Sequence, residues 1–190
     1  PINTTTLYRS VLGSFVVNDV FHRLRKYPVR TASKNFFVRF HCEVLPVKTW
    51  LIKKGFYEPW SRNCVLCPAP ETLQHVFLYY TNAELFWAEL RAVLKIDLYI
   101  EWKTAKFLQF GDRAWELLAL LGLHAIWRSR TDHLEVREGA KPAWQHFCDG
   151  FVYVSSLLEA TEQQGLEGWS EFRARLNKRA LKTRRTNISQ

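Results

Sequence analysis

Cys64 and Cys67 are separated by two residues, and His75 follows eight positions after Cys67. Thiolate and imidazole groups are preferred ligands of Zn²⁺, and a C-x-x-C pair directs both sulfurs at one ion from a single tight turn. The spacing therefore predicts a zinc knuckle with three of its four ligands in place. The fourth ligand is expected about five residues after His75, where the chain has Tyr80.

Tyr80 leaves the fourth coordination position open to three interpretations. A phenol has a reference pKa near 10, so it would lose its proton at a real cost on binding a metal. Another residue can complete the shell, or water can occupy the open position of a weakly held metal. In the third interpretation the metal is lost, and the cysteines pack as small apolar side chains. The candidates for another ligand are Cys42, Cys148 and His41.

Helical elements are expected to position these ligands. Apolar residues recur at helical spacing along most of the chain, and Pro and Gly residues mark the ends of these segments. The cysteine pair is expected in a tight turn, and residues 97–102 in a short strand or an extended loop. The expected helices cover residues 7–27, 31–43, 47–54, 71–80, 82–94, 113–138, 142–164 and 169–181.

Several residues have a specific expected role at these helices. Thr31 or Ser33 is a candidate N-cap, and Gly55 occupies a helix end that favours a left-handed residue. Glu71 precedes His75 by four residues and is a candidate hydrogen-bond acceptor for the imidazole, or else a solvated carboxylate at a helix start. The buried side of the helix over 82–94 is expected to carry Leu85, Phe86, Leu90 and Val93.

The composition predicts a mainly α fold. The chain has 190 residues, of which 47% are hydrophobic, enough for one compact domain with its own core. The segment 113–138 is apolar all round in its first half, which favours a central position. We expect a helical bundle-like single domain with a small zinc-knuckle insert.

Positive charge is concentrated in two blocks of a chain whose formal net charge is +9. Such blocks favour a polyanionic partner, although basic helix faces that are simply solvated are the alternative. Tyr57, Trp60 and Tyr79 are candidates to stack on unpaired bases or, alternatively, core residues. The candidate phosphate contacts are Arg23, Arg25, Lys26, Arg30, Lys34, Arg39, Lys48, Lys53, Lys54 and Arg62 in the first block, and Arg173, Arg175, Lys178, Arg179, Lys182, Arg184 and Arg185 in the second.

The cellular setting is inferred from composition. The chain begins at Pro1 and contains no Met, which suggests a piece of a longer protein. We find no secretory signal, and the longest apolar run, over 115–127, is too short to span a bilayer, so no membrane association is expected. Two of the four cysteines form a C-x-x-C pair, which favours an intracellular metal site over a disulfide framework.

Five segments of the chain have a recognisable order and spacing. They are NFFVRFH (35–41), LPVKTWL (45–51), KGF (54–56), NCVLC (63–67) and ETLQHVFL (71–78), followed by Phe86-Trp87. Together they resemble one known module, the zinc-binding domain that follows the reverse transcriptase in non-LTR retrotransposons. The segment over 120–130 is similar to the helix after the knuckle in such elements, especially those of tick genomes, and the resemblance covers roughly residues 33–150.

The resemblance implies a function and a division of the chain. It implies Cys64, Cys67 and His75 as Zn²⁺ ligands, with a Cys in the family where this chain has Tyr80. It implies binding of template RNA or target DNA, a parent reverse transcriptase domain as partner, and a nuclear location. The chain would comprise an N-terminal helix over 1–30, the zinc-binding domain over 31–164, and a C-terminal helix with a basic tail over 165–190.

No catalytic motif is found in the sequence. There is no Tyr-x-Asp-Asp pair to hold magnesium, no deaminase signature and no Gly-rich phosphate loop. A hydrolytic zinc site would also use three protein ligands, but paired thiolates are typical of structural sites. We therefore expect a non-catalytic nucleic-acid-binding module. The alternatives are a scaffold that packs on a polymerase, or a decayed copy that binds neither nucleic acid nor metal.

Overall fold

Helix α7 (Arg113–Leu134) is the element around which the others pack in the computed structural model. The structure describes residues 16–56, 61–64, 67–136, 138–160, 166 and 168–188. Residues Leu117 to Leu123 of α7 are buried on all sides, and the helix packs against several other helices. At its start, the Asp112 carboxylate accepts hydrogen bonds from two backbone N–H groups. The expected central helix is therefore confirmed.

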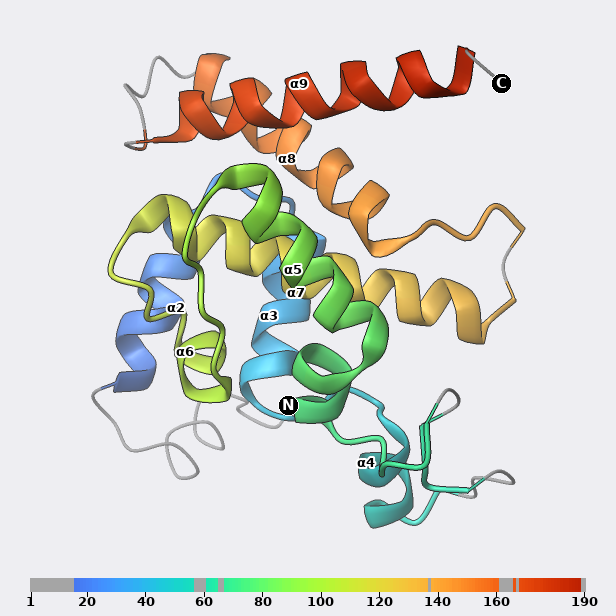
Figure 1. The fold of residues 1–190 in the computed structure, drawn as a ribbon. Helices are drawn as coiled ribbons and strands as arrows, with labels where there is room; N and C mark the ends of the chain where they lie inside the picture. Colours follow the sequence, from blue (N-terminus) through green and yellow to red (C-terminus); the bar gives the residue numbers. More distant parts are fainter. Residues whose placement is uncertain are drawn as a thin grey trace.

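The described elements form one mainly α domain, as expected from the sequence. Within the described residues no strand is formed, and the only β pairing is one isolated antiparallel bridge, Asn63–Pro70. The elements are α2 (Val16–Lys26), α3 (Thr31–His41), α4 (Lys48–Lys53), η1 (His75–Tyr79), α5 (Thr81–Leu94), α6 (Trp102–Phe107), α8 (Ala143–Ala160) and α9 (Trp169–Ile188). Helix α9 runs across the top of the view in Figure 1 beside α8, and α4 lies at the opposite end.

Two expected elements differ from the observed ones. Residues 97–101 form no regular secondary structure, and Trp102, at the end of the expected strand or extended loop, begins a short helix, α6. Helix α9 continues to Ile188, so part of the expected basic tail is helical. Its sequence from Trp169 onward contains no Gly or Pro, and nothing there interrupts the helix. The first part of the helix expected over 7–27 lies outside the described residues.

Two expected side-chain roles are wrong. Neither Thr31 nor Ser33 caps α3, because Arg30 is the N-cap residue and no side chain caps that end. The Ser33 side chain is buried and contacts His124 on α7 instead. Leu85 is 63% exposed on α5, since the buried stripe of that helix follows Ala83, Trp87, Leu90 and Leu94.

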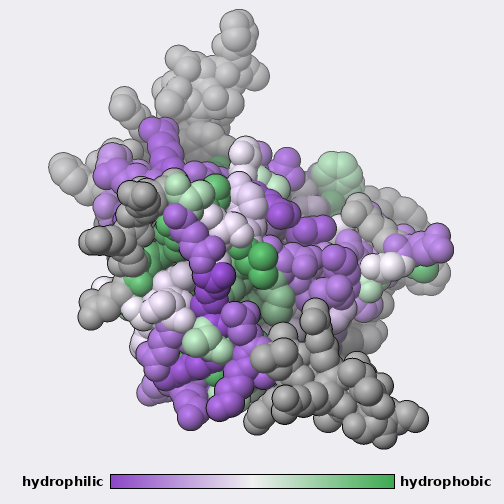
Figure 2. All heavy atoms as spheres, turned by 90° about the horizontal axis from the view of Figure 1, so that it is seen from above, coloured by the Kyte–Doolittle hydropathy of each residue, from purple (hydrophilic) through white to green (hydrophobic). Residues whose placement is uncertain are grey.

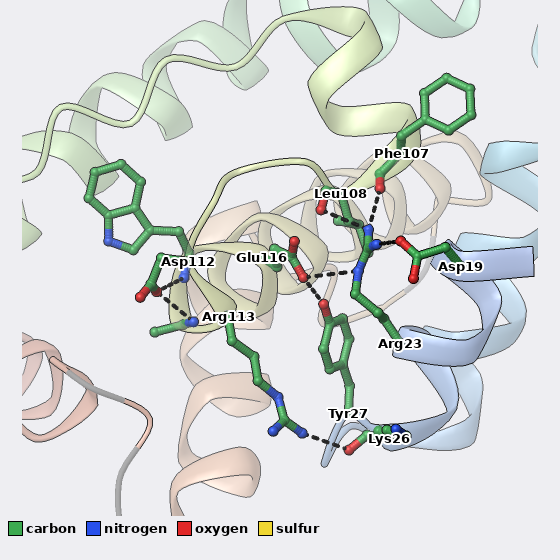
Figure 3. Close-up of polar contacts among 11 residues, drawn as sticks. Asp19, Arg23, Lys26, Tyr27, Phe107, Leu108, Asp112, Arg113 and Glu116 are labelled. Carbon is green, nitrogen blue, oxygen red and sulfur yellow. Dashed lines mark hydrogen bonds and ion pairs between the residues drawn. The ribbon is translucent and has the colours of Figure 1, made fainter. Parts of the chain in front are cut away.

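Arg23 ties α2 to α6 and α7 through a network at the edge of the core, shown in Figure 3. Its guanidinium donates to the carbonyl oxygens of Phe107 (2.9 Å) and Leu108 (3.2 Å), where α6 ends in a left-handed residue. It also pairs with Asp19 and with the carboxylate of Glu116. The Tyr27 hydroxyl donates to Glu116, and burial raises the pKa of both groups. Arg23 is thus engaged within the fold.

Gly122 allows α5 to approach α7 closely. A Cβ at this position would lie 2.5 Å from a ring carbon of Trp87 and 2.9 Å from one of Phe86. Both rings are buried, and the Trp87 indole N–H donates to the carbonyl of Phe77 at 2.9 Å. The two rings therefore have little freedom to move aside.

We predict that Gly122→Ala destabilises the protein by about 1–3 kcal/mol, although alanine is the better helix former. The steric conflict with Trp87 and Phe86 outweighs the gain in helix propensity. Denaturant unfolding would measure the change. Gly150→Ala is the matched control, because a Cβ there meets only the end of the flexible Leu121 side chain at 3.0 Å. Equal stability of Gly122→Ala and the wild type would contradict this packing.

His124 is a partly buried residue of α7 whose ring contacts a hydroxyl group and an aromatic side chain. Its Nδ1 is 3.0 Å from the Ser33 hydroxyl, and its ring lies 5.0 Å from that of Phe36. Burial, together with the positive charges of Arg128, His146 and Arg30, lowers the pKa of His124 to about 4. The imidazole is therefore neutral in the folded protein at about pH 6.

We predict that the protein loses stability as the pH falls from about 6.5 to about 4. In this window the unfolded chain binds a proton at residue 124 that the folded chain does not, so acid favours unfolding by up to about 3 kcal/mol. Burial also lowers the pKa values of His41 and His146, which act in the same direction. His124→Gln should flatten the pH dependence of the unfolding free energy. An unchanged slope in that variant would exclude His124 as a source.

Candidate metal centre

A short hairpin presents the two cysteines. The Cys64 N–H donates to the Ala69 carbonyl at 2.8 Å, and the Glu71 N–H donates to the Arg62 carbonyl at 3.0 Å. With the Asn63–Pro70 bridge, these bonds close a tight loop that contains both Cys64 and Cys67. These bonds bring the two flanks of the loop together, while residues 65 and 66 of the expected turn lie outside the described residues.

His75 is brought to the cysteines by a π-helical turn, η1, in place of the α-helix expected over 71–80. The His75 carbonyl accepts from the Tyr80 N–H at 2.7 Å, and its own N–H donates to the Thr72 hydroxyl at 3.1 Å. The imidazole is buried, and its Nε2 lies 3.4 Å from the Cys67 Sγ. π-Turns recur at functional sites because the extra residue redirects side chains.

The three side chains form a group that fits a metal ion. The ligand atoms of Cys64, Cys67 and His75 all lie within 4.8 Å of one another. Tetrahedral zinc with ordinary bond lengths separates a sulfur from a nitrogen by about 3.5 Å, close to the observed Cys67–His75 distance. Two thiols and one imidazole are also a zinc-type donor set. The group can therefore hold a metal ion, as the spacing predicted.

Tyr80 lies beside this group at the expected fourth position. Its ring is 6.2 Å from the His75 ring, and it shares a cavity of about 240 Å³ with Cys64, Arg130 and His133. Burial, and then the negative charge of Cys64, raises the pKa of the Tyr80 phenol. The hydroxyl therefore stays protonated, which makes Tyr80 a poor replacement for a thiolate.

The other candidate ligands do not join the group. Among the described residues, the cluster of metal-binding side chains around Cys64 contains none of them. His41 lies between α3 and α6, where its Nδ1 is 2.7 Å from the Lys106 carbonyl. Burial raises the pKa of the Cys42 thiol, and that of Cys148 on α8 to about 11. These thiols are neutral packing groups.

Glu71 has neither of the roles expected for it. Its carboxylate is buried and pairs with the Arg130 guanidinium of α7, and it also accepts from the Lys48 N–H at the start of α4 at 3.0 Å. The Glu71 carbonyl accepts from the Thr49 hydroxyl at 2.7 Å. Because Glu71 directly follows the hairpin, these bonds fix the hairpin to both helices. Arg130 was not singled out from the sequence, where it is one of several basic residues.

The first basic block divides into residues that bind within the protein and residues that are exposed at the surface. Lys48 belongs to the first group, because its Nζ donates to the carbonyls of Ser61 (3.4 Å) and Asn63 (3.1 Å) and so holds the hairpin. Arg23 is engaged as described above, and Lys34 donates to the Arg25 carbonyl at 2.8 Å. The exposed members are Arg25, Lys26, Arg30, Arg39, Lys53, Lys54 and Arg62.

The second basic block lies on α9, on the side of the molecule that faces the viewer in Figure 2. This face is mostly hydrophilic, with hydrophobic residues in separate patches. Arg173 pairs with Glu159, and Arg175 pairs with Glu171 and donates to the Leu94 carbonyl. Lys178 is exposed, while the side chains of Arg179, Lys182, Arg184 and Arg185 lie outside the described part of the structure.

Of the aromatic residues expected to contact bases, Tyr79 is 60% exposed, whereas Tyr57 and Trp60 lie outside the described residues.

Comparisons with protein-family models, curated proteins and solved structures found no match to this chain. In the described ranges, no helix combines the length and the apolar character needed to cross a bilayer.

We predict that purified protein gains thermal stability on addition of Zn²⁺, because a metal that binds only the folded state stabilises it. Cys67→Ser and His75→Gln should each abolish this gain, whereas Cys148→Ser, on α8 and outside the cluster, should retain it. Tyr80→Cys should bind Zn²⁺ more tightly, by completing a four-ligand shell. Metal content after dialysis and the shift of the melting temperature are the measurements. Absence of Zn²⁺ from both the wild type and Tyr80→Cys would refute the ligand assignment.

Proposed function

We propose that this chain is a non-catalytic nucleic-acid-binding module built around a zinc knuckle with three protein ligands. The observation that supports it most is the convergence of Cys64, Cys67 and His75 on a hairpin beside the basic helix α4. Paired thiolates with an imidazole are typical of structural zinc sites, which rigidify small loops for recognition. The proposal extends to an origin in the C-terminal part of a non-LTR retrotransposon polyprotein, on the segments that resemble that family.

The charge around the hairpin supports a polyanionic ligand. Residues 44–70 include four basic residues, Lys48, Lys53, Lys54 and Arg62, and one acidic residue, Glu58. The acidic side chains that flank this range are engaged, since Glu43 pairs with Lys106 and Glu71 with Arg130. Positive charge on an exposed segment attracts phosphate groups and releases their counterions. RNA or DNA is the partner class that fits this surface.

We assign no catalytic role to the module. The sequence holds five aspartates, at positions 19, 97, 112, 132 and 149, and lacks the Tyr-x-Asp-Asp pair that holds magnesium in a polymerase. The thiolate-rich donor set around His75 favours structure over hydrolysis. A parent reverse transcriptase domain as partner, and an intracellular, nuclear location, follow from the resemblance and belong to the same proposal.

A scaffold that packs on a polymerase is the second candidate function. It is favoured by apolar side chains at the surface, such as Leu85 on α5 and Val152 on α8, each 63% exposed. A groove of about 430 Å³ between α8 and α9, lined in part by Leu158 and Leu166, also offers apolar contact. A scaffold of this kind would bind the polymerase. Removing its basic residues would then leave its affinity for nucleic acid unchanged.

We predict that affinity for short single-stranded RNA or DNA falls steeply with salt, because phosphate contacts release counterions. The double variant Lys53→Ala/Lys54→Ala should weaken binding. It should also reduce the slope of log affinity against log salt concentration by about 1.4, because each of the two lost phosphate contacts contributes about 0.7. Lys95→Ala/Lys103→Ala removes the same charge from exposed residues elsewhere and is the matched control. Fluorescence anisotropy at increasing salt is the measurement. An affinity that barely changes between low and physiological salt would overturn the proposed function.

A further inference from the structure

The turn that ends α4 exposes an aromatic pair that the knuckle and the phosphate contacts leave unexplained. Phe56 is 58% exposed, and its ring stacks on that of Trp50, with centroids 6.3 Å apart and planes at 17°. The Lys54 ammonium lies 6.0 Å from the centre of the Trp50 ring. Exposed aromatic surface is unfavourable in water, and burying it against a ligand is favourable by about 25 cal/mol per Å².

The backbone holds Phe56 in this position. Gly55 has a φ of +80°, and its N–H donates to the Ile52 carbonyl at 3.0 Å. The Phe56 N–H donates to the Leu51 carbonyl, also at 3.0 Å. This pair of bonds is a Schellman motif, in which the residue after the glycine contacts the last turn of the helix. The Phe56 ring is therefore placed in advance, with one side toward Trp50 and more than half of its surface in solvent.

Exposed basic residues lie on α4 and on the segment bound to its start. Lys53 and Lys54 are exposed at the end of α4. Arg62 is also exposed. The carbonyls of its two neighbours, Ser61 and Asn63, accept hydrogen bonds from the Lys48 Nζ, and these bonds hold the segment against α4. Basic side chains beside an exposed aromatic ring are the arrangement with which proteins bind single strands, since every base has a face that can stack. Duplex DNA offers its phosphates but not its base faces.

We propose that Phe56 and Trp50 form a stacking platform for one unpaired base, with Lys53, Lys54 and Arg62 bound to the adjacent phosphates. The proposal rests on the proposed function and specifies its ligand as a single-stranded segment of RNA or DNA. The base stacks on Phe56 and extends the Phe56–Trp50 pair. Binding should show little preference for sequence, because stacking does not read hydrogen-bonding groups.

The test compares Phe56→Leu with the wild type. Leucine keeps the apolar contact with Trp50 and the Schellman turn but has no aromatic face. The matched control is Tyr99→Leu, which removes an aromatic ring that is 72% exposed on a segment apart from α4. The probes are an oligodeoxythymidine, an abasic oligonucleotide of the same length and backbone, and a duplex. Anisotropy gives the dissociation constants, and denaturant unfolding verifies that each variant is folded.

We expect Phe56→Leu to weaken binding of the oligodeoxythymidine by about five- to 150-fold, the range for loss of one stacked base. Affinity for the abasic strand and for the duplex should not change. Phe56→Trp keeps an aromatic face and should bind the oligodeoxythymidine about as tightly as the wild type. Equal losses with the abasic strand, or no loss at all, would overturn the platform while leaving phosphate binding intact. If the wild type binds no strand in a salt-dependent way, the proposed function fails first, and the platform fails with it.

Discussion

The position of the candidate metal centre depends on the contacts of one buried carboxylate, that of Glu71. A carboxylate out of water is strongly unfavourable unless its charge is paired and its oxygens accept hydrogen bonds. Here Arg130 supplies the opposite charge from α7, and the Lys48 N–H supplies a donor from the start of α4. The same residue's backbone closes the hairpin onto Arg62. One residue thus connects the central helix, the basic helix and the loop that carries both cysteines.

This arrangement gives the hairpin a support that does not require the metal. Lys48 and Thr49 bind backbone carbonyls on both sides of the cysteine loop, and Glu71 locks the far end to α7. Small zinc modules without such contacts unfold when the metal is removed. In this chain the surrounding fold holds Cys64, Cys67 and His75 close together, although the fourth position is Tyr80, a neutral phenol. A metal ion bound by these residues would add stability to a site that the fold already holds.

The sequence predicted the parts of this structure that follow from local rules. Apolar periodicity located α5, α7 and α8, Gly55 marked the end of α4, and the C-x-x-C pair with His75 identified the cluster. What it missed depends on contacts between distant residues. Ser33 was expected to cap a helix, but His124, 91 positions away, engages it in the core. The ion pair of Glu71 and Arg130 also joins residues that are 59 positions apart. The π-turn at His75 packs against α5 and α7, and local sequence does not reveal these contacts.

The long-range contacts also change the interpretation of the basic residues. From charge alone, Arg23, Lys48 and Lys53 are equivalent, but the structure gives the first two internal partners. Arg23 binds the end of α6 and offsets Glu116, and Lys48 holds the hairpin. A guanidinium or ammonium bound to backbone carbonyls keeps its charge but has fewer N–H groups left for phosphate, so direct phosphate contacts are left to the remaining exposed side chains. In the segment that leads to the cysteines these are Lys53, Lys54 and Arg62. In the proposed complex they would bind the phosphates of a single strand whose base stacks on Phe56, a contact that a duplex cannot make.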